Sequence, residues 1–179
     1  MNKKITDKKG QILIESLVAI SVIIIGLLGI FDLLSRSLSL NRTVGDQYIA
    51  SNLAAEGIEV IKNMIDSNSV DELPWNNGIS NGLYEIVYND STPNISRQIS
   101  SDPNNCTVDF INQNDPNFLT LDETTGLYGY GLPKTTSYKR IVCINNLTDE
   151  IKVSSIVTWN SRGASFDINL EDHFFNWRP

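Results

Sequence analysis

The sequence predicts an α+β protein in which one long N-terminal helix packs against an antiparallel β-sheet. An almost uniformly apolar run fills residues 12–31, and no proline precedes Pro74, so no proline interrupts a helix there. A second stretch, ending at Ile65, places apolar residues three and four positions apart, which is the spacing of one helix face. Beyond residue 82, several stretches alternate apolar and polar residues, as strands with one buried face do. The 179 residues suffice for one ordinary domain and a long helix.

The apolar run is long enough to cross a membrane. As a helix, residues 12–31 would rise roughly 30 Å, which is the thickness of the hydrocarbon core of a bilayer. We therefore expect residues 12–34 to form a membrane-spanning half of the helix. The basic cluster ahead of it consists of Lys3, Lys4, Lys8 and Lys9. The positive-inside rule keeps such a cluster in the cytoplasm and exports the part of the chain beyond the membrane helix.

Glu15 is the feature of this run that a simple anchor does not explain, because a carboxylate in hydrocarbon is costly. A cleaved secretory signal would need a small-x-small site after a shorter apolar segment of about 7 to 15 residues. Ser35, Arg36 and Ser37 match such a site only weakly. A second alternative is an ordinary signal anchor in which Glu15 extends to the lipid headgroups.

Residues 9–16, KGQILIES, resemble the leader of type IV pilins and pseudopilins. In that family a short basic leader ends in glycine, a glutamate occupies the fifth mature position, and an apolar helix comes next. The resemblance implies cleavage between Gly10 and Gln11 by a prepilin peptidase, and methylation of the new amino terminus at Gln11. Major pilins mostly begin with phenylalanine, so Gln11 is more similar to the first residue of minor pilins.

The resemblance also implies a role for Glu15 in assembly. In the family this glutamate pairs with the terminal amine of a neighbouring subunit and thereby sets the axial register of the helices. An unpaired carboxylate inside the membrane costs roughly 2.5 to 3.5 kcal/mol on insertion scales. Pairing removes part of that cost, so it favours the correctly staggered neighbour.

The second half of the helix carries the stripe that should pack on the sheet. We expect one helix over residues 11–66, with Glu56, Glu59 and Lys62 in water and Gly57 allowing close approach to the sheet. The stripe consists of Ala50, Leu53, Ala54, Gly57, Ile58, Ile61 and Ile65.

A loop over residues 67–82 should lead into the strands of a globular head, residues 67–179. Strands are predicted at 83–88, 107–111, 119–121, 127–130, 138–144, 151–159 and 166–170. The helix text ASNLAAEGIEVIKNMID and the closing strands resemble minor pilins of the PilV-like kind. The resemblance thus implies the type IV pilin fold: a leader (1–10), a helix (11–66) and a head (67–179).

Composition limits what the head can do. The formal net charge is −7, and removing residues 1–10 makes it −10, which argues against nucleic-acid binding.

Cys106 and Cys143 allow one disulfide in an exported head, the alternative being two buried thiols. Two cysteines and His173 cannot supply a usual zinc site, and no catalytic motif is present. The oxygen-rich stretches 102–105 and 112–117 form either a Ca²⁺ site or solvated turns. Their spacing lacks the EF-hand pattern and therefore favours turns.

We therefore expect a structural subunit without a cofactor and not an enzyme. The resemblance implies other pilin subunits, the assembly platform and the prepilin peptidase/methyltransferase as partners, and a route from the cytoplasmic membrane to a surface pilus. A pseudopilin of a type II secretion system would carry the same leader and helix. A membrane-anchored exported binding or hydrolase domain is the alternative of another class, and the sequence does not separate adhesion, motility and DNA uptake.

Overall fold

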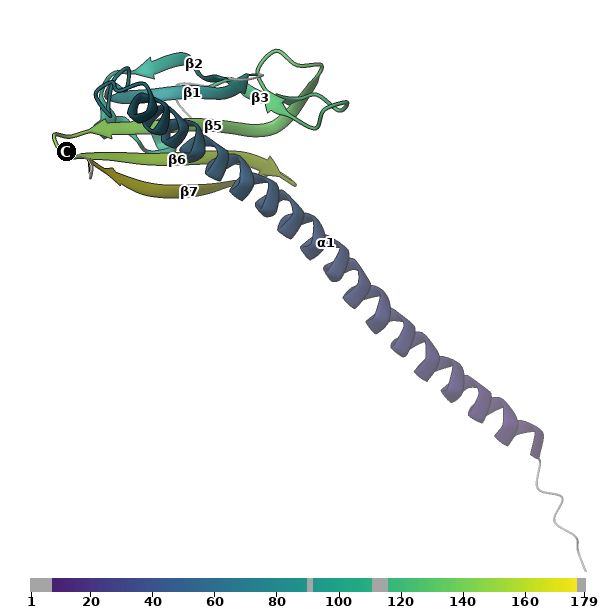
Figure 1. Ribbon diagram of the computed structural model, residues 1–179. Helices are drawn as coiled ribbons and strands as arrows, with labels where there is room; N and C mark the ends of the chain where they lie inside the picture. The colour runs from purple at the N-terminus through teal and green to yellow at the C-terminus, as the bar shows by residue number, and fades with distance from the viewer. Residues whose placement is uncertain (1–7, 90–91, 111–115, 177–179) are drawn as a thin grey trace, which may run out of the picture. The chain divides into compact units, whose positions relative to one another are not determined.

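The structure is a computed structural model that describes residues 8–89, 92–110 and 116–176 (Figure 1). In the described residues the protein is α+β: a long helix, α1 (Lys8–Val70), precedes seven strands. The chain divides into two compact units, one ending at Gly45 and the other running from Asp46 to Pro179. The boundary falls inside α1, whereas the sequence placed the start of the head after the helix.

Helix α1 has 63 residues and extends the expected range, 11–66, at both ends. It stops after Val70 because the chain turns back on itself: Asp71 N–H donates to the Ser67 carbonyl and Leu73 N–H to the Asn68 carbonyl, both at 2.9 Å. Glu72 adopts a left-handed conformation with φ of 57°, and Pro74 lies two residues further on, which together form a common helix ending.

The second unit contains residues 46–70 of α1, a short 3₁₀ turn (η1, Pro103–Asn105) and an antiparallel sheet. The strands are β1 (Gly82–Asn89), β2 (Thr92–Ser100), β3 (Phe118–Leu121), β4 (Tyr128–Gly129), β5 (Lys134–Asn146), β6 (Glu150–Ser161) and β7 (Ala164–Phe175).

Strand β5 is the centre of the sheet because it pairs on both of its edges. One edge pairs along its length with β6, from Tyr138 with Trp159 to Asn146 with Ile151. The other edge is shared: β3 pairs with the first half of β5 and β1 with residues 142–144. Strands β2, β4 and β7 form the outer edges.

Residues 46–70 of α1 pack on one face of this sheet (Figure 1). Val60 and Ile61 are buried against the sheet near Val142 and Ile144, and Leu53 lies in a second cluster with Trp159. The expected apolar stripe of the helix is therefore the face that meets the sheet, apart from Ile58, which is only partly buried.

Gly57 is the point of closest approach between helix and sheet. A Cβ atom at this position would lie 2.5 Å from Ser155 Oγ and 2.8 Å from Val142 Cγ2. Both distances are below any normal contact, so only glycine fits while the two backbones keep this separation. The expected packing role of Gly57 is confirmed.

The opposite face of the sheet has a smaller core of its own. Side chains alternate along β5, so Ile141 and Cys143 point away from the helix face that Val142 and Ile144 occupy. They cluster with Leu83 and Ile156, and partly buried side chains from the end of β2 and the segment after it pack against them: Ile99, Cys106, Val108 and Phe110.

One predicted strand is wrong, and one observed strand was not predicted. The strand expected at residues 107–111 is wrong, because residues 108–110 are helical and Thr107 Oγ1 accepts the Phe110 N–H at 3.2 Å, as a helix cap does; residue 111 lies outside the described part. Strand β2 was not expected at all. The other predicted strands are present, most of them longer than the alternation indicated.

Candidate functional site

The residues that resemble a prepilin motif lie in the first turns of α1. The helix already begins at Lys8, so the Gly10–Gln11 bond lies within it. Gly10 is surrounded by open space, with no heavy atom of another segment within 4 Å of a Cβ placed there. Gln11 and Glu15 are exposed and four residues apart, which puts them one turn apart on the same side of the helix.

The apolar segment of α1 exposes its side chains. Among residues 12–34 the large apolar side chains range from 49% exposed at Leu27 to 70% at Ile25. Among the described residues, α1 is the one helix long and apolar enough to cross a membrane by length and composition. The coarse expectation of an N-terminal helix suited to a membrane anchor therefore agrees with the structure.

Polar side chains within this segment are satisfied by the helix itself. Ser16 Oγ donates to the Leu13 carbonyl at 2.9 Å, and Ser21 Oγ donates to the Leu17 carbonyl at 2.8 Å. At the end of the apolar run, Asp32 pairs with Arg36 across one turn at 3.0 Å. These local bonds reduce the cost of placing serine in a nonpolar medium.

Glu15 is different, because no ion-pair partner for it exists among the side chains that the structure describes. Asp32 has its arginine four residues away, whereas position 19, four residues after Glu15, is alanine. The described side chains of α1 therefore hold no partner that could neutralise Glu15 in a nonpolar medium.

In the head, Arg140 is a fully buried cation that joins α1 to the sheet. Its guanidinium donates to the Leu53 carbonyl of α1 at 2.9 Å and to the Ile86 carbonyl of β1 at 2.6 Å. It also pairs with Glu56 at 3.2 Å. The expectation that Glu56 lies in water is therefore wrong, because its side chain is half-buried against Arg140. The β1–β5 ladder ends at Tyr84, so Arg140 supplies a donor to β1 beyond the point where the strands part.

Glu85 is the corresponding buried anion. Its carboxylate accepts bonds from Arg97 Nη2 and the Asn117 N–H, both at 2.8 Å, and from Asn117 Nδ2 at 3.0 Å. It thereby ties β2 and the start of β3 to β1. Neither Glu85 nor Arg140 was predicted from the sequence, because a charge in a half-buried strand ordinarily lies on the solvated face.

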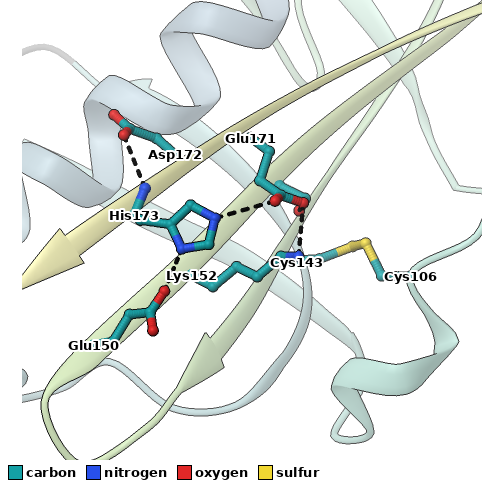
Figure 2. A network of polar contacts seen from close by, with 8 residues as sticks. Cys106, Cys143, Glu150, Lys152, Glu171, Asp172 and His173 are labelled. Carbon is teal, nitrogen blue, oxygen red and sulfur yellow. Dashed lines mark hydrogen bonds and ion pairs between the residues drawn. A yellow bond between two sulfur atoms is a disulfide. The ribbon is translucent and has the colours of Figure 1, made fainter.

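A solvent-facing polar network connects β6 and β7 (Figure 2). The His173 imidazole lies between two carboxylates, with Nδ1 on Glu150 and Nε2 3.1 Å from Glu171. Glu171 also binds Lys152 Nζ at 2.8 Å. Hydrogen bonds to Glu150 and then Glu171 raise the pKa of His173. Hydrogen bonds from Lys152 and then His173 and Ser154 lower the pKa of Glu171 to about 2.

This network fits a structural role. Both imidazole nitrogens contact carboxylates across or along the two strands, and the side chains of His173 and Glu171 are 42% and 40% exposed. The interpretation of His173 as a surface residue therefore accounts for its contacts.

Cys106 and Cys143 form a disulfide, with their Cα atoms 6.0 Å apart. The bond fastens the segment around η1 to β5 over the smaller core (Figure 2). A polar groove of about 270 Å³ lies beside it. In the described ranges, no group of three histidine, cysteine or acidic side chains could hold a metal ion. At residues 102–105, Asp102 Oδ1 accepts the Asn104 N–H at 2.9 Å and so caps a turn, while most of 112–117 lies outside the described residues.

Comparison of the chain with protein-family models, with curated protein sequences and with solved structures gives no match. The function must therefore be argued from the residues and contacts of the chain itself.

Proposed function

We propose that this chain is a minor subunit of the type IV pilin kind, with the fold of that family. In this proposal, prepilin peptidase cleaves it after Gly10, and residues 12–34 hold it in the cytoplasmic membrane with the head exported. Other pilin subunits and the assembly platform then incorporate it into a pilus filament, or use it to prime one.

The observation that carries the proposal is Glu15, which has no ion-pair partner among the described side chains. It lies near the start of an exposed apolar helix, five residues after Gly10. Cleavage at Gly10 would create an ammonium group at Gln11, one helical turn before Glu15. Opposite charges at that spacing on neighbouring copies can pair only when the copies are staggered by a defined amount.

The exposed side chains of residues 12–34 support the same mechanism. Lipid solvates them while the subunit waits in the membrane, and neighbouring helices would replace lipid in a filament. Packing of this surface would supply affinity, whereas the Glu15 pair would supply register. The head would stay folded throughout, because its own core is complete without those residues.

The proposal is tested first by N-terminal sequencing of the protein recovered from membranes. We expect the mature chain to begin at Gln11, and Gly10→Val should leave the full-length precursor in the membrane. Gly29→Val, the same change at another glycine with open space around it, should still be cleaved. A terminus after Ser37, or normal processing of Gly10→Val, would mean that the chain is not a prepilin.

The register role of Glu15 gives a second prediction. Glu15→Ala should be cleaved normally but should enter filaments roughly tenfold less well, which corresponds to losing a pair worth about 1.4 kcal/mol. The matched control is Ser16→Ala, because Ser16 binds only its own helix. Immunoblots of sheared filaments and of membranes measure the two pools, and equal incorporation of both variants would contradict the role.

A further inference from the structure

The chain contains two Asn–Gly pairs, Asn77–Gly78 and Asn81–Gly82, separated by only two residues. Glycine after asparagine leaves the next backbone nitrogen unshielded by a Cβ atom and free to rotate. That nitrogen can then attack the asparagine side chain. Whether it does so depends on how firmly the local structure holds the two residues, and the two pairs differ sharply in this respect.

Asn77–Gly78 lies in an exposed turn with room to move. Both residues are solvent-exposed, and Gly78 has φ of 74° with nothing within 4 Å of a Cβ placed on it. Two hydrogen bonds hold the Asn77 backbone. The Asn77 N–H donates to the Pro74 carbonyl at 2.8 Å, and Asn68 Nδ2 donates to the Asn77 carbonyl at 2.8 Å. Its side-chain amide has no hydrogen bond in the described part of the chain.

Asn81–Gly82 is held in place from several sides. Asn81 Oδ1 accepts the backbone N–H of Asn146, and its carbonyl accepts Tyr84 Oη at 3.1 Å. Gly82 begins β1, pairs with Ile144, and lies so close to β2 that an added Cβ would be 2.4 Å from the Ser100 carbonyl oxygen. The Gly82 nitrogen cannot reach the Asn81 side chain unless this end of β1 opens.

We infer that Asn77–Gly78 is a site of spontaneous deamidation in the folded protein, and that Asn81–Gly82 is protected. The deprotonated Gly78 nitrogen attacks Asn77 Cγ, forming a five-membered succinimide, and Nδ2 leaves as ammonia. Water then opens either carbonyl of the ring, which yields an aspartate or an isoaspartate at position 77. Water is the only co-reactant, and no oxidant or enzyme is required.

The product would alter the connection between α1 and β1. Asn68, in the last turns of α1, holds the carbonyls of both Asn77 and Trp75 through its Nδ2, at 2.8 and 3.2 Å. An isoaspartate inserts an extra methylene into the backbone at the first of these acceptors and leaves a new carboxylate. The clamp that Asn68 makes would therefore loosen at position 77, and the acidic head would gain one more negative charge.

The test uses the full chain purified in detergent with its disulfide intact. The protein is incubated in mildly alkaline buffer, folded in one arm and denatured in the other, and peptide mass spectrometry follows loss of the amide at each asparagine. Isoaspartate is measured separately by methyltransferase labelling. In the folded arm Asn77 should react on the order of tenfold faster than Asn81, and in the denatured arm the two rates should converge.

Asn77→Gln and Asn81→Gln serve as matched controls, because a glutamine side chain forms the corresponding ring far more slowly. The first variant should remove the folded-state signal, and the second should leave it unchanged. Equal rates at the two sites in the folded protein would overturn the inference.

Discussion

Gly57 decides how near α1 can lie to the sheet, and it yields a prediction whose sign is not obvious from helix propensity. Gly57→Ala should gain about 1 kcal/mol in helix propensity but lose roughly 1 to 3 kcal/mol through overpacking against Ser155 and Val142. We expect a net loss of up to about 2 kcal/mol, measured by chemical unfolding of the head.

The matched control for that change is Gly45→Ala in the same helix. No heavy atom lies within 4 Å of a Cβ at Gly45, so only the propensity gain applies and the unfolding free energy should not fall. If the two alanine variants were equally stable, the close approach at Gly57 would not constrain the packing.

Single residues differed in how well the sequence alone could place them. Gly57 was identifiable because it interrupts a stripe of larger apolar residues. Arg140 and Glu85 were not, because the hydrogen-bonding groups that stabilise them come from distant segments: Leu53 and Ile86 for the first, Arg97 and Asn117 for the second. A buried charge is tolerable only with such partners, and one sequence does not show which segments meet.

At the scale of elements, β6 and β7 are held together partly by charges that titrate. The pKa of His173 is raised above its ordinary value of 6.5. Its contribution to the free energy of unfolding is therefore fully present below pH 6.5 and is lost as the pH rises through the raised pKa. The pKa of Glu171 is lowered to about 2, so its contribution is present above its ordinary value of 4.5 and is lost as the pH falls toward 2.

His173→Gln should therefore lower the thermal midpoint most between about pH 4.5 and 6.5, and the difference from wild type should disappear in alkaline buffer. Asp167→Asn changes a charge on the same exposed face of β7 without touching His173 and serves as the control. A midpoint difference that is independent of pH would mean that His173 acts by packing alone.

Elements were predictable where the sequence kept one clear pattern over many residues. The helix and strands β5, β6 and β7 carry long periodic patterns, and their existence was correctly predicted. Strand β2 reads TPNISRQIS, with a proline and few apolar residues, which is tolerated because it pairs only with β1 at the sheet edge. The helical turn at 108–110 depends on the Thr107 cap and on the nearby disulfide, neither of which alternation reveals.

At the scale of the whole molecule, the head has two cores, and the disulfide belongs to the smaller one. Replacing both Cys106 and Cys143 by serine should cost about 3 to 4 kcal/mol in the chain-entropy model, given the sequence separation of 37 residues. The loss should appear first as faster proteolysis around residues 101–110, while the core between α1 and the sheet persists.

Reduction of the wild-type protein supplies the comparison for the double serine variant. The reduced protein should match that variant in protease sensitivity, since both lack the same covalent link. If neither treatment altered the unfolding free energy, the segment around η1 would be held by packing and hydrogen bonds alone.

The α+β architecture was predictable from periodicity, but the division of the chain was not. The sequence shows an apolar run and then a separate stripe from Ala50, but it does not show that the compact unit of the head begins inside the helix, near residue 45. That boundary arises from what the sheet can cover, and it becomes apparent only when Ala50 and Leu53 are seen buried while Tyr48 is 69% exposed.

The central place of β5 also determines when the head can fold. Synthesis delivers α1, β1 and β3 well before β5, yet β1 and β3 pair with opposite ends of that one strand. Until residue 146 has been made, β1 and β3 lack the strand that holds them in one sheet, and the apolar stripe of α1 lacks part of the sheet on which it packs. The β1–β2 hairpin can therefore form early, but the sheet that unites β1 with β3 can be completed only after β5 has been made.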